Sequence, residues 1–362
     1  MRAAVVETVP GGVGISDVEI DEPRFGEVLV RTVATGVCHS DLHAMHGHGI
    51  VAPSPFVLGH EPAGVVEAIG PGVNNVKPGD HVVACLSVYC GHCANCLTGH
   101  SYRCFTDDDA RAADAPPRLT RNGETVHQFV GVGGFGEHML VSQHHLVAID
   151  KALPLERACL LGCGVLTGVG AALNTTPVSA GSTVAVIGCG GVGISAIQGA
   201  RIAHARRIVA IDVDDEKLEL ARRCGATDVV NARNDDAVAA VQKLLRGGAD
   251  FVFEAIGSAA TIQQALGMAG FGGAVTVVGI PGAEEQVSIS GIDLLMGKSI
   301  RQSLMGSNRF VADIPLLAGF ALDGVLDLDV MVSLEAPLDD LPRVLDDLEA
   351  GNVLGRAVIT FA

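Results

Sequence analysis

The chain has 362 residues, which is long for one typical core, so its length predicts two domains. Hydrophobic residues make up 48% of the sequence and charged residues 18%, a composition that supports buried cores and excludes a disordered chain. The formal net charge of −17 would repel phosphate backbones, and we therefore expect no nucleic-acid partner.

The start of the chain, Met1–Glu7, lacks the long apolar run of a secretion signal and is predicted to be a strand. No uninterrupted apolar stretch is long enough to cross a bilayer, so we expect no membrane partner. Ten cysteines without a secretion signal indicate reduced thiols or metal ligands rather than disulfides. Together these features predict a cytoplasmic protein.

The first third of the chain has short apolar runs between Gly and Pro turns, which predicts a compact β-rich domain. Clear turns lie at Gly70–Gly72 and Lys77–Asp80, and the polar, Pro-containing stretch Asp107–Pro117 is predicted to be an exposed loop. The expected strands are Val28–Val33, Ala63–Ile69, His81–Ala84 and His138–Val141.

Several reactive side chains follow the first of these strands. The stretch Gly36–His43 includes a thiol, two imidazoles, a hydroxyl and a carboxylate, from Cys38, His39, His43, Ser40 and Asp41. Loops that leave rigid strands often carry chemistry, but a Cys beside a His is more often a packing or surface feature. Two later stretches, Gly59–Glu61 and Leu161–Gly164, contribute His60 and Cys163, which could complete a Cys/His/Cys zinc site.

The most specific motif of the chain is a group of four cysteines at spacings of three, three and eight residues: Cys90, Cys93, Cys96 and Cys104. Four thiolates suit tetrahedral zinc, and closely spaced cysteines let one loop wrap the ion. An all-sulfur shell leaves no open position for a substrate, so this zinc site is predicted to be structural. An iron–sulfur cluster and a redox dithiol remain alternatives.

After Pro177 the pattern changes to alternating strands and helices. A continuous apolar strand, Ser182–Ile187, leads into a glycine-rich turn, and a helical pattern follows through Ala203. This is the context of a dinucleotide-binding fingerprint, in which glycines let the backbone approach a pyrophosphate at the start of a helix. The glycines of this turn are Gly188, Gly190, Gly191 and Gly193.

The next expected strand, Arg207–Ile211, ends at Asp212. The Asp212 carboxylate is placed to bind the adenosine ribose hydroxyls and would repel a 2′-phosphate, and no Arg follows it directly. An ordinary cap of the strand end is the alternative interpretation. Further strands bring the predicted parallel sheet to about six strands, a full dinucleotide-binding domain. These are expected at Asp228–Asn231, Asp250–Glu254, Ala274–Gly279 and Ser299–Leu304.

The tail of the chain is predicted to form helices at Ile314–Leu322 and Leu338–Ala350 and a strand at Arg356–Phe361 that returns to the first domain. Four further cysteines fit neither motif and are predicted to be buried packing residues. They are Cys85, Cys159, Cys189 and Cys224.

With its motifs in this order, the chain resembles the zinc-dependent medium-chain alcohol dehydrogenase family over essentially its whole length. The likeness is greatest to the longer-chain type that includes the liver and the glutathione-dependent formaldehyde enzymes. The resemblance implies an α/β protein: a β-rich GroES-like catalytic domain, 1–165 and 306–362, around a Rossmann doubly wound parallel sheet, 166–305, that binds NAD. The motifs are Gly36–Asp41, Gly59–Gly64, the four cysteines, Leu161–Thr167 and Gly188–Gly193.

The resemblance assigns roles at the catalytic zinc. Cys38, His60 and Cys163 match its ligands, and the neighbouring Glu61 matches a carboxylate that can approach the ion. Asp41 matches the acceptor that orients the His60 ring through its other nitrogen. The matching proton relay consists of Ser40 and His43.

The resemblance also implies cofactor contacts. Thr167 and Val192 match contacts on the nicotinamide, and Lys217 matches a lysine on the adenosine ribose. Val278 lies where the family holds the carboxamide by its backbone. His39 and Arg356 match the pyrophosphate clamp, and a neutral imidazole at His39 in place of arginine should weaken cofactor binding.

The implied substrate pocket is walled by Ser40, Leu86 and Phe129. Leu86 stands where relatives often carry an aromatic ring, so we expect an apolar, roomier pocket that favours primary alcohols with a medium-chain, aromatic or terpenoid body. The formaldehyde enzymes place an arginine four residues past the last structural cysteine, where this chain has Asp108. A thiol-adduct formaldehyde dehydrogenase and a non-catalytic zinc-stabilised binding protein remain alternatives.

The resemblance implies that each chain binds two zinc ions, NAD and a small alcohol or aldehyde substrate. It also implies that the protein is a homodimer. An apolar edge at Leu294–Met296 and Ile300 supports the dimer, because an unpaired strand edge invites pairing with a second copy. The long loop Phe105–Gln128 also resembles the dimeric members of the family.

Overall fold

The computed structural model describes residues 1–50, 52–106, 111–112 and 114–361. The chain forms two compact units. Unit 1 comprises Met1–Cys163, Arg309–Gly324 and Val332–Ala362, and unit 2 comprises Gly164–Asn308 and Val325–Met331. The chain thus leaves unit 1 after residue 163, where the sequence suggested 165, and returns to it at 309, where the sequence suggested 306.

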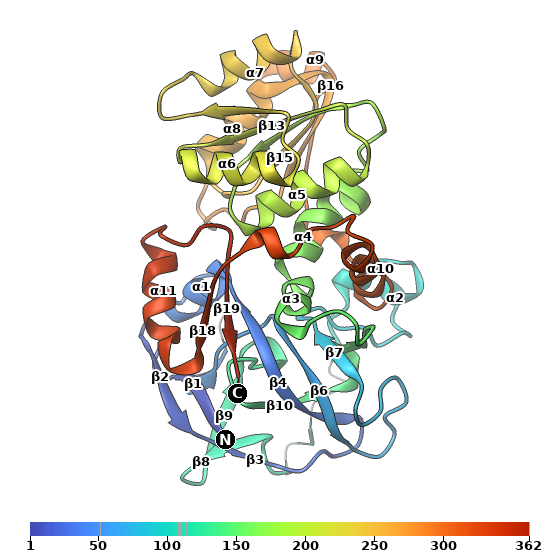
Figure 1. Ribbon diagram of the computed structural model, residues 1–362, viewed down its shortest axis with the longest axis vertical. Helices are drawn as coiled ribbons and strands as arrows, with labels where there is room; N and C mark the ends of the chain where they lie inside the picture. Colours follow the sequence, from blue (N-terminus) through green and yellow to red (C-terminus); the bar gives the residue numbers. More distant parts are fainter. Residues whose placement is uncertain (51, 107–110, 113, 362) are drawn as a thin grey trace. The chain divides into compact units, whose positions relative to one another are not determined.

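Unit 1 contains two β-sheets and is drawn mainly in blue and cyan in Figure 1. The first sheet has the order β2-β1-β5-β9-β8-β3. Its strands are β1 (Arg2–Val6), β2 (Val13–Asp17), β3 (Glu19–Ile20), β5 (Phe56–Val57), β8 (Leu119–Arg121) and β9 (Glu124–Gln128).

The second sheet of unit 1 has the order β11-β7-β6-β4-β19-β18, and β10 also pairs with β4. The C-terminal strand β19 is antiparallel to β4, so the tail of the chain completes the sheet that begins near residue 27. The strands are β4 (Glu27–Val37), β6 (Pro62–Ile69), β7 (His81–Ala84), β10 (His138–Ser142), β11 (Leu146–Ala148), β18 (Val332–Pro337) and β19 (Arg356–Thr360).

The helices of unit 1 are short, apart from two near the C-terminus. The helix predicted from Ile314 begins earlier, at Phe310, with Pro315 tolerated inside it. The helix predicted from Leu338 begins at Leu341, after a 3₁₀ turn at Leu338–Asp340. The α-helices are α1 (His39–His46), α2 (Ala94–Leu97), α3 (Leu155–Ala158), α10 (Phe310–Leu322) and α11 (Leu341–Glu349).

Unit 2 is a parallel six-stranded sheet with the order β14-β13-β12-β15-β16-β17. Because the first strand lies in the middle and the chain proceeds outward to each side, this is the doubly wound order of a dinucleotide-binding fold. The α/β fold class predicted from the sequence is confirmed. The strands are β12 (Thr183–Ile187), β13 (Arg207–Asp212), β14 (Asp228–Asn231), β15 (Ala249–Glu254), β16 (Ala269–Val277) and β17 (Ser299–Gln302).

Helices connect the strands of unit 2, and their buried faces pack with the sheet around Val209, Val252 and Ile262. β16 begins at Ala269, five residues before the predicted strand, because its glycine-rich start lacks apolar alternation. The helices are α4 (Gly164–Gly170), α5 (Gly191–Ile202), α6 (Asp215–Cys224), α7 (Ala237–Leu245), α8 (Ala259–Met268) and α9 (Gly291–Leu295).

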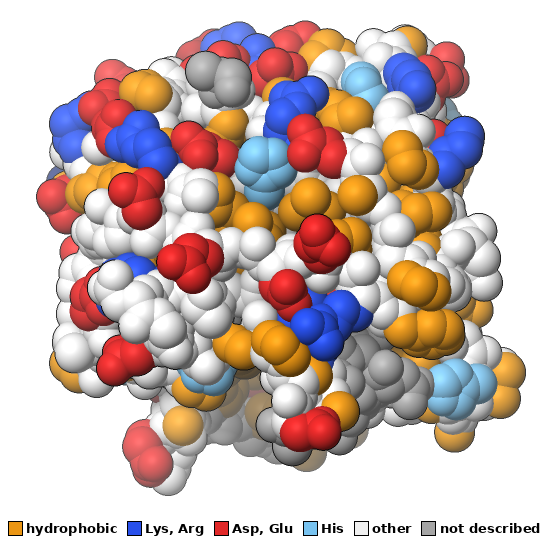
Figure 2. Space-filling view, turned by 90° about the horizontal axis from the view of Figure 1, so that it is seen from below, with side chains coloured by type: hydrophobic (Ala, Val, Ile, Leu, Met, Phe, Trp, Pro, Cys, Tyr) orange, Lys and Arg blue, Asp and Glu red, His pale blue; other side chains and the backbone are white. Residues whose placement is uncertain are grey.

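Within the described ranges, no single helix is long and apolar enough to span a membrane. The segments Leu155–Gly162 and Gly164–Thr175 reach that length and composition only when joined as a bent pair. Figure 2 shows one face of the molecule, on which acidic, basic and hydrophobic side chains are interspersed. Such mixing accords with ion pairs like the one between Arg121 Nη1 and Glu7 Oε1, at 2.5 Å.

Candidate metal centres and cofactor-binding loop

Cys38 lies where a buried strand turns into a helix. β4 ends at Val37, and Cys38 caps the N-terminus of α1 in an extended conformation. The Cys38 backbone N–H donates to Asp41 Oδ2 at 3.0 Å, so the carboxylate in the first helical turn satisfies a backbone group that the helix leaves unpaired. This local geometry holds the Cys38 thiol at the end of the strand.

The second oxygen of Asp41 orients His60. His60 Nδ1 lies 3.0 Å from Asp41 Oδ1, and both side chains are fully buried. Burial by itself lowers the pKa of His60, but the adjacent carboxylate outweighs it and the net pKa is raised. The negative surroundings that favour a proton on the ring also favour a metal cation in its place: in the neutral ring with Nδ1 donating to Asp41, the lone pair lies on Nε2, which is buried without a hydrogen-bond partner. An unpaired buried nitrogen of this kind is suited to a metal ion.

Two further ligands come from different segments. Glu61 follows His60 directly before β6, and Cys163 follows the 3₁₀ turn Cys159–Gly162. One ligand atom from each of Cys38, His60, Glu61 and Cys163 lies within 4.8 Å of all the others. Glu61 Oε1 is also buried and without a hydrogen-bond partner. Two sulfurs, an imidazole and a carboxylate form a donor set that fits zinc.

Glu61 also forms a buried ion pair with Arg356, whose side chain is 5% exposed. Burial raises the pKa of Glu61 to about 7, and the Arg356 charge opposes that shift. A Cβ at Gly36 would overlap Glu61 Oε2, so a glycine is needed where the pair passes β4. Arg356, which the sequence assigned to the cofactor pyrophosphate, therefore has a protein partner here, and its role toward the cofactor stays a prediction.

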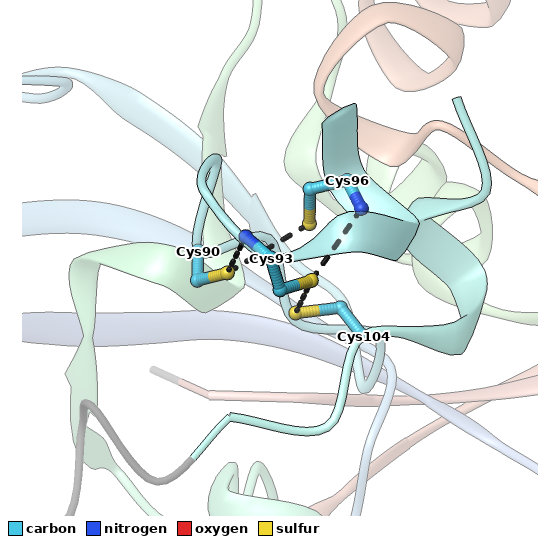
Figure 3. A group of neighbouring side chains, drawn as sticks. All are labelled: Cys90, Cys93, Cys96 and Cys104. Atoms are coloured by element: carbon cyan, nitrogen blue, oxygen red, sulfur yellow. Dashed lines mark hydrogen bonds between the residues drawn. The ribbon is translucent and has the colours of Figure 1, made fainter. Parts of the chain in front are cut away.

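The four-cysteine motif forms one compact thiol cluster, which Figure 3 shows with all sulfurs turned toward one another. Cys90 Sγ lies 3.9 Å from Cys96 Sγ, and Cys93 Sγ lies 3.8 Å from Cys104 Sγ. Zinc–sulfur bonds of about 2.3 Å in a tetrahedron separate the sulfurs by about 3.8 Å, so the spacing fits zinc. The backbone N–H groups of Cys93 and Cys96 donate to Cys90 and Cys93 sulfurs, which stabilises thiolates.

The remaining cysteines are buried and carry no metal cluster among the described residues. Burial raises the pKa of Cys85 to about 12 and that of Cys224 to about 12, so both thiols stay protonated. The prediction that Cys85, Cys159, Cys189 and Cys224 are buried is confirmed. None of the ten cysteines forms a disulfide in the described part of the chain.

Of the predicted relay and pocket residues, Ser40 and Phe129 lie beside ligands of the Cys/His/Glu site in unit 1. Ser40 Oγ lies 3.7 Å from Cys38 Sγ, and His43 follows one turn later on α1. The Phe129 ring is buried and meets the His60 ring edge to face, with centroids 5.6 Å apart. Leu86 is half-buried just beyond β7, and His39 is exposed in the first turn of α1.

The glycine-rich turn of unit 2 has the geometry of a phosphate-binding loop. Gly188 has a φ of 87°, in the left-handed region, and a Cβ at Gly193 would overlap the Gly188 carbonyl. In contrast, a Cβ at Gly190 would meet no atom within 4 Å, which leaves open space where α5 begins. Gly191 is the first residue of α5, and its neighbour Val192 follows in the same turn. The arrangement fits the pyrophosphate of a dinucleotide.

Asp212 is held rigidly at the end of β13. Its Oδ2 accepts from Cys189 N at 2.7 Å, and its Oδ1 accepts from Val213 N at 2.7 Å and Asp214 N at 3.1 Å. The Cys189 donor joins the carboxylate to the glycine-rich turn. Lys217 lies half-buried in the first turn of α6, which begins three residues after Asp212.

Other predicted cofactor residues have contacts inside unit 2. The Thr167 hydroxyl lies 3.5 Å from Met305 Sδ, and a Cβ at the adjacent Gly168 would overlap the Val192 carbonyl, so α4 and α5 pack closely. Val278 N donates to the Glu254 carbonyl at 2.7 Å, just beyond β16. Val278 follows the end of a central strand, where ligands of doubly wound sheets bind.

Sequence reasoning missed two residues at this edge of the sheet. Arg233 Nε lies 3.3 Å from the Val213 carbonyl, next to Asp212, although the sequence suggested no arginine nearby. The feature that could have revealed this arginine is the parallel pairing of β13 with β14, which brings the loop after Asn231 beside Asp212. The second is Glu254, a fully buried carboxylate whose Oε1 accepts from Ile256 N at 2.9 Å and Gly257 N at 2.8 Å.

Two protein-family models match the chain. Residues 24–151 match the family model described as alcohol dehydrogenase GroES-like domain, and residues 191–319 match the model described as zinc-binding dehydrogenase. The alcohol dehydrogenase class-3 of Drosophila melanogaster is 36% identical over 99% of this chain and 97% of its own length. The chain belongs to the zinc-binding alcohol dehydrogenase family.

Two more relatives bear on its chemistry. The S-(hydroxymethyl)glutathione dehydrogenase of Haemophilus influenzae is 35% identical over 99% of this chain and 97% of its own length. The crystal structure of benzyl alcohol dehydrogenase from Acinetobacter calcoaceticus is 34% identical, with a TM-score of 0.92 over 100% of this chain and 99% of that chain. The protein is thus an oxidoreductase of the alcohol dehydrogenase type, and its two clusters fit a catalytic and a structural zinc ion.

Proposed function

We propose that the protein transfers hydride between a primary alcohol of medium-chain, aromatic or terpenoid type and NAD, giving the aldehyde. The observation that carries the proposal is the group of Cys38, His60 and Cys163, in which Cys38 is half-buried, the other two are buried, and His60 Nε2 has no hydrogen-bond partner. A closed structural site needs four protein ligands, whereas three with an adjacent carboxylate leave a position for substrate.

A zinc ion held by Cys38, His60 and Cys163 would supply a Lewis acid that lowers the pKa of a bound alcohol. Asp41 keeps the His60 ring in one orientation and fixes which nitrogen faces the ion. Ser40, beside Cys38, takes the alcohol proton in this proposal, and His43 on the same helix passes it onward. Burial around Phe129 keeps water away from the reacting atoms.

For the cofactor we propose NAD over NADP. Asp212 would face an extra 2′-phosphate at close range, and its position is fixed by three backbone donors. Contact between like charges in a partly buried site costs a few kcal/mol, on the order of a hundredfold in preference. Arg233, whose Nε lies 3.3 Å from the carbonyl of the next residue, Val213, should reduce that penalty, so in this proposal the preference depends on both residues.

The alternative substrate is an S-hydroxymethyl thiol, as in the name of the Haemophilus influenzae relative. A glutathione adduct carries carboxylates and needs cations to meet them. Three arginines that could serve are committed elsewhere: Arg111 and Arg118 bind Glu27 at 2.6 and 2.8 Å, and Arg121 binds Glu7. Because these arginines are already paired with carboxylates, their ion pairs support an uncharged alcohol as the substrate. Asp108, at the arginine position of the formaldehyde enzymes, lies outside the described residues.

The test is kcat/KM for ethanol, octanol, benzyl alcohol and S-hydroxymethylglutathione under one condition with NAD. Octanol and benzyl alcohol should exceed ethanol, because each buried methylene contributes about 0.8 kcal/mol. The charged adduct should be poor, given the net charge of −17. If the adduct has the highest kcat/KM, the protein is a thiol-adduct dehydrogenase. Equal kcat/KM values for ethanol and octanol would refute the apolar pocket.

We also propose a homodimer formed through the outer edge of unit 2. β17 is the last strand of its sheet, and the adjacent α9 exposes Ile292, Leu294 and Leu295 to 59%, 66% and 78%. An unpaired edge beside exposed apolar side chains favours pairing with a second copy.

A further inference from the structure

A group of imidazoles that belongs to neither proposed zinc centre lies at the C-terminal end of α1. His43 and His46 lie in the last turn of the helix, and Gly47 ends it with a φ of 78°. The chain then folds back, so that His48 N donates to the His43 carbonyl at 2.7 Å. As a result the centre of the His48 ring lies 6.4 Å from that of His43 and 6.3 Å from that of His46.

A carboxylate borders the same group. Glu349 is the last residue of α11, and its Oε1 lies 3.7 Å from His46 Nε2. The side chains of His46 and Glu349 are 39% and 56% exposed, and His48 is exposed as well, so dissolved ions can reach them. Three imidazoles and one carboxylate are the donor types that zinc and similar first-row cations prefer.

The spacing of the rings is close to that of a metal site. Two imidazoles on one tetrahedral zinc ion, with Zn–N bonds of about 2.0 Å, have ring centres about 5 Å apart. The observed separations exceed this by about 1 Å, which rotation of exposed side chains between rotamers can supply. The net charge of −17 raises the local concentration of cations.

We propose that His43, His46 and His48, with Glu349, bind a divalent transition-metal cation of the zinc class, as a third metal position on the chain. This position differs from the two zinc centres because its ligands are exposed and their side chains must change rotamer to reach the ion. It should therefore bind the cation more weakly and reversibly. One consequence rests on the proposed function: a cation that takes the His43 ring removes it from the proton relay and slows turnover.

Direct binding tests the site independently of activity. Enzyme dialysed to constant zinc content is titrated with Zn²⁺ alone in a calorimeter, beside the variants His46→Gln and His48→Gln. The wild type should bind one further zinc ion, and each variant should bind it about tenfold or more weakly, since each loses one ligand. His204→Asn, which changes an exposed histidine of unit 2, is the control and should bind as wild type.

Inhibition is the second measurement. Added Zn²⁺ should lower the turnover of octanol in the wild type and in His204→Asn, and about tenfold more should be needed in His46→Gln and His48→Gln, whose activity without added zinc is unchanged. The metal site is refuted if no further zinc binds or if neither variant weakens its binding. If zinc binds as expected but leaves turnover unaltered, the site stands and the relay role of His43 in the proposed function is wrong.

Discussion

At the scale of single residues, Asp41 links the local and the long-range parts of the metal site. One of its oxygens accepts from the Cys38 backbone and the other from the His60 ring. Because a carboxylate can accept at both oxygens, one buried side chain sets the position of two candidate ligands that are 22 residues apart in the chain. The Cys38 and His60 positions therefore depend on each other through Asp41.

The two metal clusters should respond differently to loss of one thiol. Cys163→Ala should abolish turnover while the fold is retained, because the Cys/His/Glu site serves chemistry. Cys96→Ala should mainly lower thermal stability, because metal binding to the four-cysteine cluster is coupled to the folding of its loop. After dialysis to constant zinc content, which removes weakly bound ions, metal analysis should find two zinc ions in the wild type and one in each variant. One zinc or none in the wild type, with loss during purification excluded, would contradict the assignment.

Asp212 and Arg233 should control cofactor preference in opposite directions. Asp212→Gly should erode the preference for NAD, since it removes the charge that faces a 2′-phosphate. Arg233→Gln should widen the preference, because it removes the cation near Val213. The measurement is kcat/KM for NAD and NADP with each variant, together with the affinity for 2′-AMP. Equal wild-type kcat/KM values for NAD and NADP would show that Asp212 does not select the cofactor.

At the scale of elements, a buried ion cluster fixes the start of β4. Glu27 is 3% exposed and accepts hydrogen bonds from Arg111 Nη2 at 2.6 Å, Arg118 Nε at 2.8 Å and Arg24 N at 2.9 Å. Arg111 also binds Asp21 Oδ2 at 2.7 Å. Segments more than eighty residues apart in the sequence are joined by this one carboxylate, which ties the region after the structural-zinc motif to the central sheet of unit 1.

This cluster predicts a specific dependence of stability on pH. Burial opposes ionisation of Glu27, but Arg111 and its neighbours dominate and lower the pKa to about 2 from the usual 4.5. A carboxyl group with a lowered folded pKa contributes stability that is complete above pH 4.5 and is lost as the pH falls toward 2. The shift corresponds to about 3 kcal/mol at neutral pH.

Glu27→Gln should therefore lower the free energy of unfolding by about 2–4 kcal/mol at pH 7 and by less at pH 3.5. Urea unfolding at both pH values measures the difference. Glu67→Gln is the matched control, since Glu67 is 39% exposed in its pair with Arg31, and such exposed pairs contribute at most about 1 kcal/mol. A Glu27→Gln effect that is the same at both pH values would contradict the role of this charge.

At the scale of the whole molecule, the prediction is the oligomeric state. Light scattering of the purified protein should give twice the chain mass of 37.1 kDa. Leu294→Glu should shift the protein to the monomer, because a charge on exposed α9 opposes apolar pairing, whereas Leu97→Glu, at the 72% exposed Leu97 of α2, should not. A wild-type mass equal to that of one chain would refute the dimer.

The features that could be predicted from the sequence were local ones. The spacing of Cys90, Cys93, Cys96 and Cys104 within one short segment was enough to predict a thiol cluster, because so short a chain can wrap only one ion. The strand, glycine turn and helix at Gly188–Gly193 were likewise readable, because the fingerprint, its strand and its helix are contiguous. Alternation of strands and helices then predicted the parallel sheet.

The pairing of distant side chains became visible only in the folded structure. Arg356 meets Glu61 because β19 pairs with β4, and Arg233 approaches Val213 because β14 pairs with β13. His48 joins His43 and His46 only because the chain turns back at Gly47. Such contacts follow from sheet order and register, which depend on the packing of the whole chain, whereas residue spacing in a sequence gives distances only along the backbone.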